Sequence, residues 1–348
     1  NKFHNNCSDI RFTDNSSSWN EHDWDISYSY WIESGCNTSS TKVWIKIPQI
    51  PASSQKTIYM YYGNASAMSQ NNGDNTFEFF DDFNGTSLDT GKWNLGRWTG
   101  TGSYDATVSN GYVRLSAGAS TSGGIVSKVG FSFPFIVEGS YRKVALGENW
   151  HSIAQNSAGS DNDWVRDGYS SSSYYYQKRT SGTISTYQTF ARSAPTNWTK
   201  IKLIWLSNAS YYYEDDVQIN SVTTQDRWNS GTNYIQFFEW NNGQADYDYI
   251  YVRKYTSPEP TTSLYAEQNS YSFNYRRLIT IDNTSNSNNL YNYQVSLTFD
   301  TSDTNRFHNN CSDIRFTDNS TSWNEHDWDV SYPYWIESGC GTSSTKAW

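Results

Sequence analysis

Residues 150–176 combine aromatic rings with acidic and amide side chains. Sugar recognition needs this combination, because flat rings stack on the apolar faces of sugars and polar groups bind the hydroxyls. Asp161, Asn162 and Asp163 lie in the same stretch and could supply the polar groups. Alternating tyrosines on a sheet also pack across strands, and the pattern favours this structural interpretation over ligand binding. The candidate sugar-binding residues are Trp150, Trp164, Tyr169 and Tyr175.

The four cysteines form two pairs, each with a sequence separation of 29 residues. One disulfide per pair is the simplest interpretation, and it indicates an oxidising compartment. Closing a loop of about 30 residues stabilises a fold by roughly 3 kcal/mol in the chain-entropy picture. A metal site that includes His4 or His22 is the alternative, although zinc sites use more closely spaced cysteines. The predicted disulfide cysteines are Cys7, Cys36, Cys311 and Cys340.

Asn-X-Ser/Thr sequences occur at ten positions. A chain rich in Asn, Ser and Thr produces such sequences by chance, but their density in an exported protein predicts glycosylation of several. The candidates are Asn6, Asn15, Asn37, Asn64, Asn84, Asn197, Asn208, Asn283, Asn310 and Asn319.

The composition is typical of a secreted β-protein with an aromatic core. Aromatic residues make up 17% of the chain, whereas hydrophobic residues make up only 36%. The net charge of −10 argues against nucleic acid as a partner, because such partners require a basic surface. No run of 18 apolar residues occurs, so the sequence predicts no membrane-spanning helix.

A repeat organises the chain. Residues 3–44 recur as residues 307–348, with five changes over 42 aligned positions and a constant offset of 304. Similarity at a fixed period is the signature of a tandem array. We therefore expect the chain to be one period of a longer protein, in which neighbouring copies follow one another head to tail.

Alternating apolar residues predict strands along much of the chain, among them Thr41–Ile47, Thr57–Tyr62 and Phe133–Tyr141, and no long helix. We expect an all-β protein whose residues 1–75 form a β-sandwich domain lacking its first strands. We expect residues 77–255 to form a second sandwich and residues 256–270 to form a proline-stiffened linker. Residues 271–348 should be the N-terminal part of the next copy of the first domain. The first domain should then have an open sheet edge, to be filled by the preceding repeat or a neighbouring subunit through strand donation.

Two resemblances cover nearly the whole chain. The first part resembles a β-rich domain of unknown function found, often as repeats, in secreted and surface proteins of archaea and bacteria. Residues 77–255 resemble a concanavalin A-type jelly roll of the laminin-G and glucanase-like superfamily. The first resemblance rests on Cys7–Asp14, Tyr30–Glu33, Val43–Pro48, Ile58–Asn64 and the lead-in Tyr275–Ile281. The second rests on Phe80–Phe83, Leu88–Trp93, Val108–Leu115 and Asp248–Tyr255.

The jelly-roll resemblance bears on catalysis and on metal binding. Glucanases of this type carry Glu-X-Asp-X-X-Glu on one strand, and the chain lacks that pattern, so we expect no enzymatic activity. If the first and last strands of the jelly roll pair, Asp81, Asp82 and Asp248 could offer oxygen ligands to calcium. Calcium is therefore the candidate cofactor, and acidic loops facing solvent are the alternative interpretation.

The sequence favours a structural or adhesive extracellular repeat protein, which forms a fibre, stalk or filament at the cell surface. Neighbouring copies would be its partners, joined through strand complementation. The alternative is a lectin-like module in which the jelly roll binds glycans. An enzyme that processes glycans is the third and least favoured hypothesis, because the carboxylate strand is missing.

Overall fold

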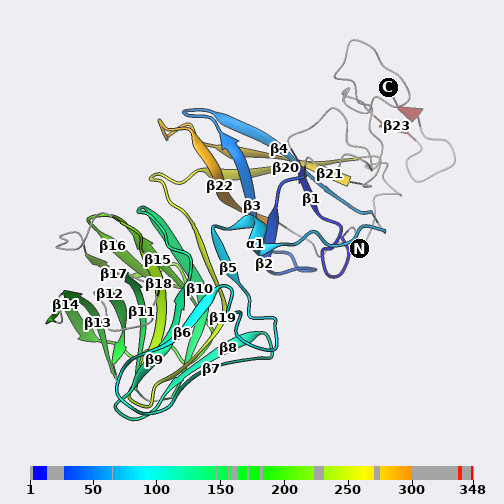
Figure 1. Ribbon diagram of the computed structural model, residues 1–348. Helices are drawn as coiled ribbons and strands as arrows, with labels where there is room; N and C mark the ends of the chain where they lie inside the picture. Colours follow the sequence, from blue (N-terminus) through cyan, green and yellow to red (C-terminus); the bar gives the residue numbers. More distant parts are fainter. Residues whose placement is uncertain are drawn as a thin grey trace. The chain divides into compact units, whose positions relative to one another are not determined.

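Strands account for nearly all of the secondary structure, which confirms the expected all-β fold class. The chain forms two compact units, one made of Asn1–Phe77 with Thr256–Trp348 and the other of Glu78–Tyr255 (Figure 1). The computed structural model describes residues 3–13, 27–64, 66–145, 147–155, 157, 164–170, 172–180, 183–222, 231–269, 275–299, 336–338 and 346–347.

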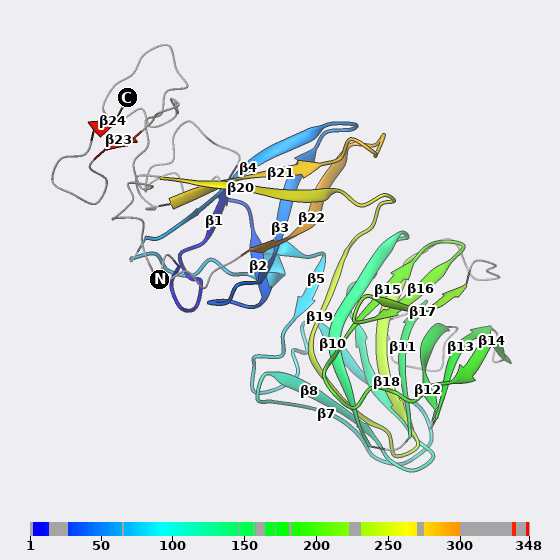
Figure 2. The ribbon, with the colours of Figure 1, turned by 180° about the vertical axis from the view of Figure 1, so that it is seen from behind.

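Two small sheets build the first unit, with strand orders β1-β4-β21-β20 and β2-β3-β22. Each sheet joins strands from before and after the second unit, and Figures 1 and 2 show the blue strands beside the yellow and orange ones. The bounds are Arg11–Thr13 (β1), Tyr30–Ser34 (β2), Thr41–Ile50 (β3), Gln55–Tyr62 (β4), Gly73–Thr76 (α1), Thr261–Asn269 (β20), Tyr275–Asp282 (β21) and Leu290–Phe299 (β22). Ile336–Ser338 (β23) and Lys346–Ala347 (β24) pair with each other.

Alternation along β3 creates the core of the first unit. Val43, Ile45 and Ile47 are fully buried, as expected for β-branched residues that share one face of a strand. They belong to one hydrophobic core with Ile281 of β21 and Val295 of β22. Because this core draws side chains from both parts of the chain, the first unit is complete only when β21 and β22 are in place.

The pairing differs from the expected linker and open edge. β20 lies within the predicted linker and pairs with β21 from Thr261–Asp282 to Asn269–Tyr275. β21 in turn pairs with β4 along its length, and β22 pairs with β3. The strands that the sequence suggested as the lead-in of the next copy therefore complete the domain that precedes them. Spacing along the chain could not reveal this, because the pairing partners are separated by the entire second unit.

Two larger sheets form the second unit. One has seven strands in the order β14-β13-β12-β11-β18-β9-β6; the other has eight, in the order β17-β16-β15-β10-β19-β8-β7 with β5 paired to β19. A single hydrophobic core draws residues from both sheets, so they are the two layers of a sandwich.

The strand bounds of the second unit are Phe79–Asp81 (β5), Trp93–Thr99 (β6), Tyr104–Ser109 (β7), Tyr112–Ala117 (β8), Ser122–Ser127 (β9), Phe135–Ala145 (β10), Glu148–Ala154 (β11), Trp164–Ser170 (β12), Ser173–Thr180 (β13), Thr183–Ala191 (β14), Thr199–Trp205 (β15), Ser210–Glu214 (β16), Val217–Val222 (β17), Tyr234–Trp240 (β18) and Gln244–Lys254 (β19).

Tyrosines fill much of the sandwich core and direct their hydroxyls to buried carboxylates. The hydroxyls of Tyr169 and Tyr212 donate to Glu214, and that of Tyr174 donates to Asp167. Burial raises the pKa of the tyrosines well above the ordinary value, so each hydroxyl keeps its proton and remains a donor. These bonds satisfy polar atoms that would be costly to bury unpaired.

Candidate functional site

The outer face of the seven-stranded sheet carries the candidate site. Residues alternate along β12, so that Val165 and Tyr169 belong to the sandwich core while Trp164 and Arg166 point away from it. The same alternation on β18 turns Phe237 inward and Phe238 outward. Neighbouring strands therefore present their outward side chains on one continuous surface.

Glycines in a cross-strand row give the rings on this surface room to lie against the sheet. Gly124 pairs with Phe238, Phe238 with Trp150, Trp150 with Gly168, and Gly168 with Tyr175. A Cβ atom at Gly168 would lie 2.7 Å from Trp150 Cε3, and one at Gly124 would lie 2.7 Å from Phe238 Cβ. Each glycine thus leaves open the space that the neighbouring aromatic side chain occupies.

A groove with a volume of about 360 Å³ opens on this face. Its size falls within the range of about 300–1,000 Å³ that is usual for small-molecule sites. The aromatic residues that line it come from three strands and are Trp98, Trp164, Phe238 and Trp240. The other lining residues are Thr99, Ser122, Glu148, Arg166, Arg179 and Ile184.

Arg166 is held between two of the outward-facing tryptophans. Its guanidinium carbon lies 3.6 Å from the ring centroid of Trp150 and 4.0 Å from that of Trp164, well within the range of cation–π attraction. Its Nε and Nη2 donate to Gln177 Oε1 at 3.0 and 2.6 Å. Burial lowers the pKa of Arg166 to about 9, while the charge of Glu148 raises it. The guanidinium is therefore cationic at neutral pH.

Polar side chains continue from Arg166 across the sheet. Gln177 Nε2 donates to Thr186 Oγ1 at 3.1 Å. On the other side of Arg166, Ser152 Oγ donates to Gln236 Oε1 at 3.2 Å. The bond from Gln177 to Thr186 fixes the amide that accepts from Arg166 and so fixes the orientation of the guanidinium.

Glu148 is the carboxylate in the lining of the groove. Its Oε2 accepts a hydrogen bond from Trp150 Nε1 at 3.0 Å, and its Oε1 accepts one from Ser170 Oγ at 2.9 Å. Both oxygens therefore have protein partners. The carboxylate orients the Trp150 indole that stacks on Arg166.

The structure brings together three of the four candidate sugar-binding residues. Trp164 lines the groove, Trp150 lies beneath Arg166, and the Tyr175 ring centroid is 6.2 Å from that of Trp150. Tyr169 was wrongly included: it is fully buried on the opposite face and donates to Glu214. It lies five positions after Trp164, an odd offset, so strand alternation turns it into the core.

Sequence reasoning missed most of the groove. Trp98 and Trp240 are distant in sequence from β12 and reach the site only through the strand order β12-β11-β18-β9-β6. A local signal did exist for Phe238 and Trp240 and for Glu148 and Trp150, because each pair is two residues apart and shares a face. Asp161, Asn162 and Asp163, considered as polar partners, lie outside the described residues.

The structure does not assemble the expected calcium ligands. Asp81 accepts hydrogen bonds from Trp93 Nε1 at 2.7 Å and Phe83 N at 2.9 Å, while Asp82 Oδ2 accepts from Asn84 Nδ2 at 2.7 Å. Asp248 lies at a register shift of β19, and burial together with the Asp82 charge raises its pKa. In the part of the chain that the structure describes, no group of three or more His, Cys, Asp or Glu residues could hold a metal ion.

The glycosylation candidates differ in exposure. Asn283 is only 2% exposed, and its Nδ2 donates to the carbonyl oxygens of Pro51 and Asn288, so a glycan at this position would require local unfolding. Asn64 is partly buried and its Oδ1 accepts from Ser66 N. The exposed candidates are Asn6, Asn37, Asn84, Asn197 and Asn208. Asn15, Asn310 and Asn319 lie outside the described residues.

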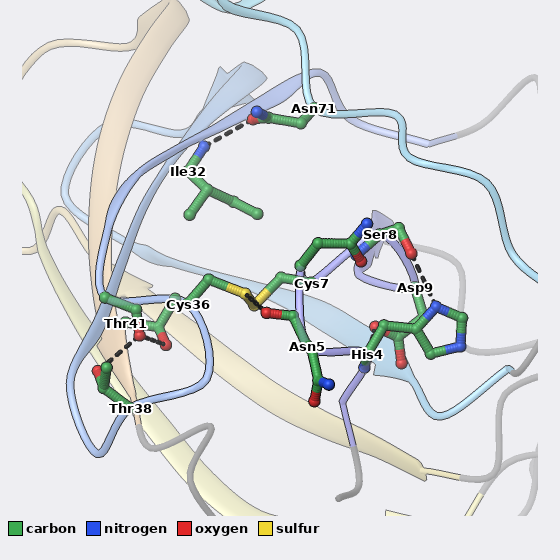
Figure 3. The surroundings of a disulfide bond; sticks show 12 residues. His4, Asn5, Cys7, Ser8, Asp9, Ile32, Cys36, Thr38, Thr41 and Asn71 are labelled. Atoms are coloured by element: carbon green, nitrogen blue, oxygen red, sulfur yellow. Dashed lines mark hydrogen bonds between the residues drawn. A yellow bond between two sulfur atoms is a disulfide. The ribbon is translucent and has the colours of Figure 1, made fainter.

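Cys7 and Cys36 form a disulfide in the first unit, with Cα atoms 5.9 Å apart (Figure 3). It ties the turn before β1 to the loop between β2 and β3. Beside it, Asp9 accepts from the backbone N of His4 at 2.9 Å and of Gly63 at 2.7 Å. Cys311 and Cys340 lie outside the described residues.

The chain matches one family model over residues 6–96, described as a domain of unknown function (DUF2341). The match covers the N-terminal strands of the first unit and continues into the start of the sandwich. No curated protein matches the chain significantly.

Several solved structures show distant similarity to about half of this chain. An endo-β-1,3-glucanase from Pyrococcus furiosus shares 11% identity, with a TM-score of 0.42 over 51% of this chain and 93% of that one. A laminarinase from Flavobacterium sp. UMI-01 shares 15% identity, with a TM-score of 0.40 over 51% of this chain and 100% of that one. The carbohydrate recognition domain of Emp47p shares 13% identity, with a TM-score of 0.40 over 49% and 92%. Similarities this distant do not transfer a function.

In the described part of the chain, no helix has the length and apolar character needed to cross a membrane.

Proposed function

We propose that the sandwich unit binds carbohydrate in the groove of its seven-stranded sheet. The observation that carries the proposal is the gathering of Trp98, Trp164, Phe238 and Trp240 around one cavity that also has charged and hydroxyl-bearing side chains in its wall. Sugar rings have apolar C–H faces and polar edges, so a site of this composition is complementary to both. The rings project from strands rather than loops, which limits the entropy lost on binding.

The proposal is one of binding without hydrolysis. Most glycosidases place two carboxyl groups about 5–9.5 Å apart across the scissile bond. The residues that line the groove include Glu148 as their carboxylate, and both of its oxygens already accept hydrogen bonds from Trp150 and Ser170. Glu148 therefore positions Trp150 and Ser170. Among the described residues, the lining contains no second carboxyl group that could act with it as a catalytic pair.

The test is glycan binding by the full chain and by Trp164→Ala. We expect the wild type to bind on a glycan array and the variant to bind at least about tenfold more weakly, because a stacked ring contributes on the order of 1 kcal/mol beyond its buried area. Trp198→Ala is the matched control, since Trp198 is 40% exposed and lies outside the groove. Absence of binding to every glycan, or equal binding by Trp164→Ala, would contradict the proposal.

A second candidate function is extracellular linkage of repeated units. The observation that favours it is the pairing of β21 and β22, which follow the sandwich in sequence, with β4 and β3, which precede it. In an array with the 304-residue period, the same two strands could instead pair with the copies of β4 and β3 in the next period, which would join neighbours by strand complementation. The Cys7–Cys36 disulfide supports an oxidising, extracellular location for this fibre or stalk.

Complementation can be tested with a chain shortened after residue 269 and a synthetic peptide of residues 270–299. We expect the shortened chain to lose the first unit, because its core lacks Ile281 and Val295, and the peptide to restore it with one-to-one stoichiometry. Titration calorimetry and circular dichroism would follow the recovery. A peptide in which Ile281 and Val295 are replaced by Asp is the control, and failure of the native peptide to bind would contradict the linkage.

A further inference from the structure

The charge of the groove is opposite in sign to that of the whole chain. The chain carries a net charge of −10, yet the lining of the groove contains two guanidinium groups, Arg166 and Arg179, and one carboxylate, Glu148. The lining is therefore positive by one charge. A positive groove in an acidic protein attracts anions locally while the rest of the surface repels them.

Arg166 is oriented to receive an anion. Its guanidinium is stacked between Trp150 and Trp164 and bound through Nε and Nη2 to Gln177. A guanidinium has five N–H donors, and Nη1 of Arg166 makes no hydrogen bond within the described residues. Because the side chain is already immobilised, a carboxylate or sulfate that binds Nη1 does not have to order it.

Two further features of the groove support an acidic ligand. Trp98 lines the groove, and its indole Nε1 is buried without a hydrogen-bond partner among the described residues. Both carboxylate oxygens of Glu148 accept hydrogen bonds from protein donors, Trp150 Nε1 and Ser170 Oγ, so they are less available as acceptors for a ligand. Donors therefore outnumber available acceptors at this surface.

We propose that the groove selects anionic glycans, in which a carboxylate or sulfate on the sugar binds Arg166 and Arg179 while the ring stacks on the aromatic lining. This inference rests on the proposed carbohydrate-binding function. Planar carboxylates fit the guanidinium fork with two parallel hydrogen bonds, and sulfate oxygens offer the same acceptors. A neutral glycan would fill the same groove and leave the guanidinium without its counter-charge.

The experiment compares ligands that differ only in charge. Calorimetry on the full chain would use oligogalacturonate against its methyl ester for the carboxylate, and sulfated dextran against dextran for the sulfate. In at least one of the two pairs, we expect the anionic ligand to bind about tenfold or more tightly than its neutral counterpart. Hydrogen bonds to charged groups have free energies of this size. The pair that shows the difference identifies the anion.

Variants assign the effect to Arg166. Arg166→Gln should bring anionic binding down to the level of the neutral ligand, and Arg166→Lys should restore only part of it, because lysine keeps the charge but lacks the fork. Arg97→Gln is the matched control: Arg97 is exposed on β6 outside the groove lining and carries the same charge, so affinity should not change. If Arg97→Gln weakens binding as much as Arg166→Gln, the charge effect is not local and the inference is wrong.

A salt titration of the unmodified protein gives an independent result should Arg166→Gln fail to fold. Affinity for the anionic ligand should fall as sodium chloride is raised from roughly 0.05 M to about 0.5 M, because screening weakens exposed charge pairs. Affinity for the neutral ligand should not change. Equal affinity for charged and neutral ligands would overturn the proposed selectivity for anionic glycans but would leave the proposed carbohydrate binding intact. If the protein bound none of the four ligands and nothing on a glycan array, both proposals would be wrong.

Discussion

His151 is a buried titratable residue among aromatic rings. It is 1% exposed, and its ring centroid lies 4.7 Å from that of Tyr141 and 5.7 Å from that of Phe237. Burial lowers the pKa of His151 from 6.5 to about 3. The ring is thus neutral in the fold at every pH at which the sandwich is expected to be stable.

The His151 pKa shift predicts a pH dependence of stability. Between pH 6.5 and about 3 the unfolded chain binds a proton at His151 that the folded chain does not. The free energy of unfolding should therefore be unaffected by this residue above pH 6.5 and should decrease below it, by about 1.4 kcal/mol per pH unit at most. His151→Phe should reduce that slope, as measured by urea unfolding over this pH range.

The control for this prediction is His4→Gln, which alters a partly exposed histidine of the other unit. Lys143 and Glu239 are further buried titratable groups of the sandwich with shifted pKa values, so the comparison must be between variants and not with an absolute slope. If wild type and His151→Phe lose stability equally between pH 6.5 and 3, His151 does not carry the dependence.

At the residue scale, the sequence predicted the kind of side chains in the site better than their positions. Trp150, Trp164 and Tyr175 were identified from composition and proximity alone, and all three face outward. The prediction for Tyr169 was wrong because closeness in sequence does not take strand alternation into account. Arg166 was missed because its importance comes from the register that places it between two tryptophans of adjacent strands, and register depends on long-range pairing.

At the level of elements, β22 makes the first unit depend on strands that follow the sandwich. Along this strand, Val295 is 2% exposed and belongs to the core, whereas Tyr291 is 54% exposed. Substitutions of these two residues therefore compare a buried and an exposed position on the same strand. Both residues pair with β3, Tyr291 with Gln49 and Val295 with Ile45.

Val295→Asp should unfold the first unit and leave the sandwich folded. An unpaired carboxylate in an apolar core destabilises a fold by several kcal/mol, and the two units have separate hydrophobic cores. Hydrogen exchange should show lost protection in β3 and β4 with retained protection in β10 and β11. Tyr291→Asp is the control and should change little; uniform loss of protection in both units would contradict independent folding.

Strand positions were the most predictable part of the elements. Alternation identified β3 and β4 because their buried face is a run of apolar residues that ends at turns. It did not identify β11–β14, where both faces are occupied: Trp150, Arg166 and Gln177 fill the outer face, and Asp167 lies in the core. A strand with large side chains on both faces lacks the usual contrast between an apolar and a polar face.

At the scale of the whole molecule, the repeat was visible but its connectivity was not. Residues 3–44 and 307–348 differ at five of 42 positions, so in a longer array the next copy of β3 and β4 would be an alternative partner for β21 and β22. Sequence alone favoured the later partner, because it is adjacent in the chain. The structure pairs β21 with β4 and β22 with β3, the strands that precede the sandwich, and their side chains share one hydrophobic core.

This arrangement also determines how the molecule would carry tension. The chain enters the sandwich at β5 and leaves it from β19, and these two strands pair with each other. The ladders β4–β21 and β3–β22 connect the segment before the sandwich to the segment after it. Pulling on both flanks would therefore load those ladders, while the sandwich, which is inserted between β4 and β20 in the chain, would carry no load. We expect a ligand in the proposed groove to stay bound while the flanking segments are under tension.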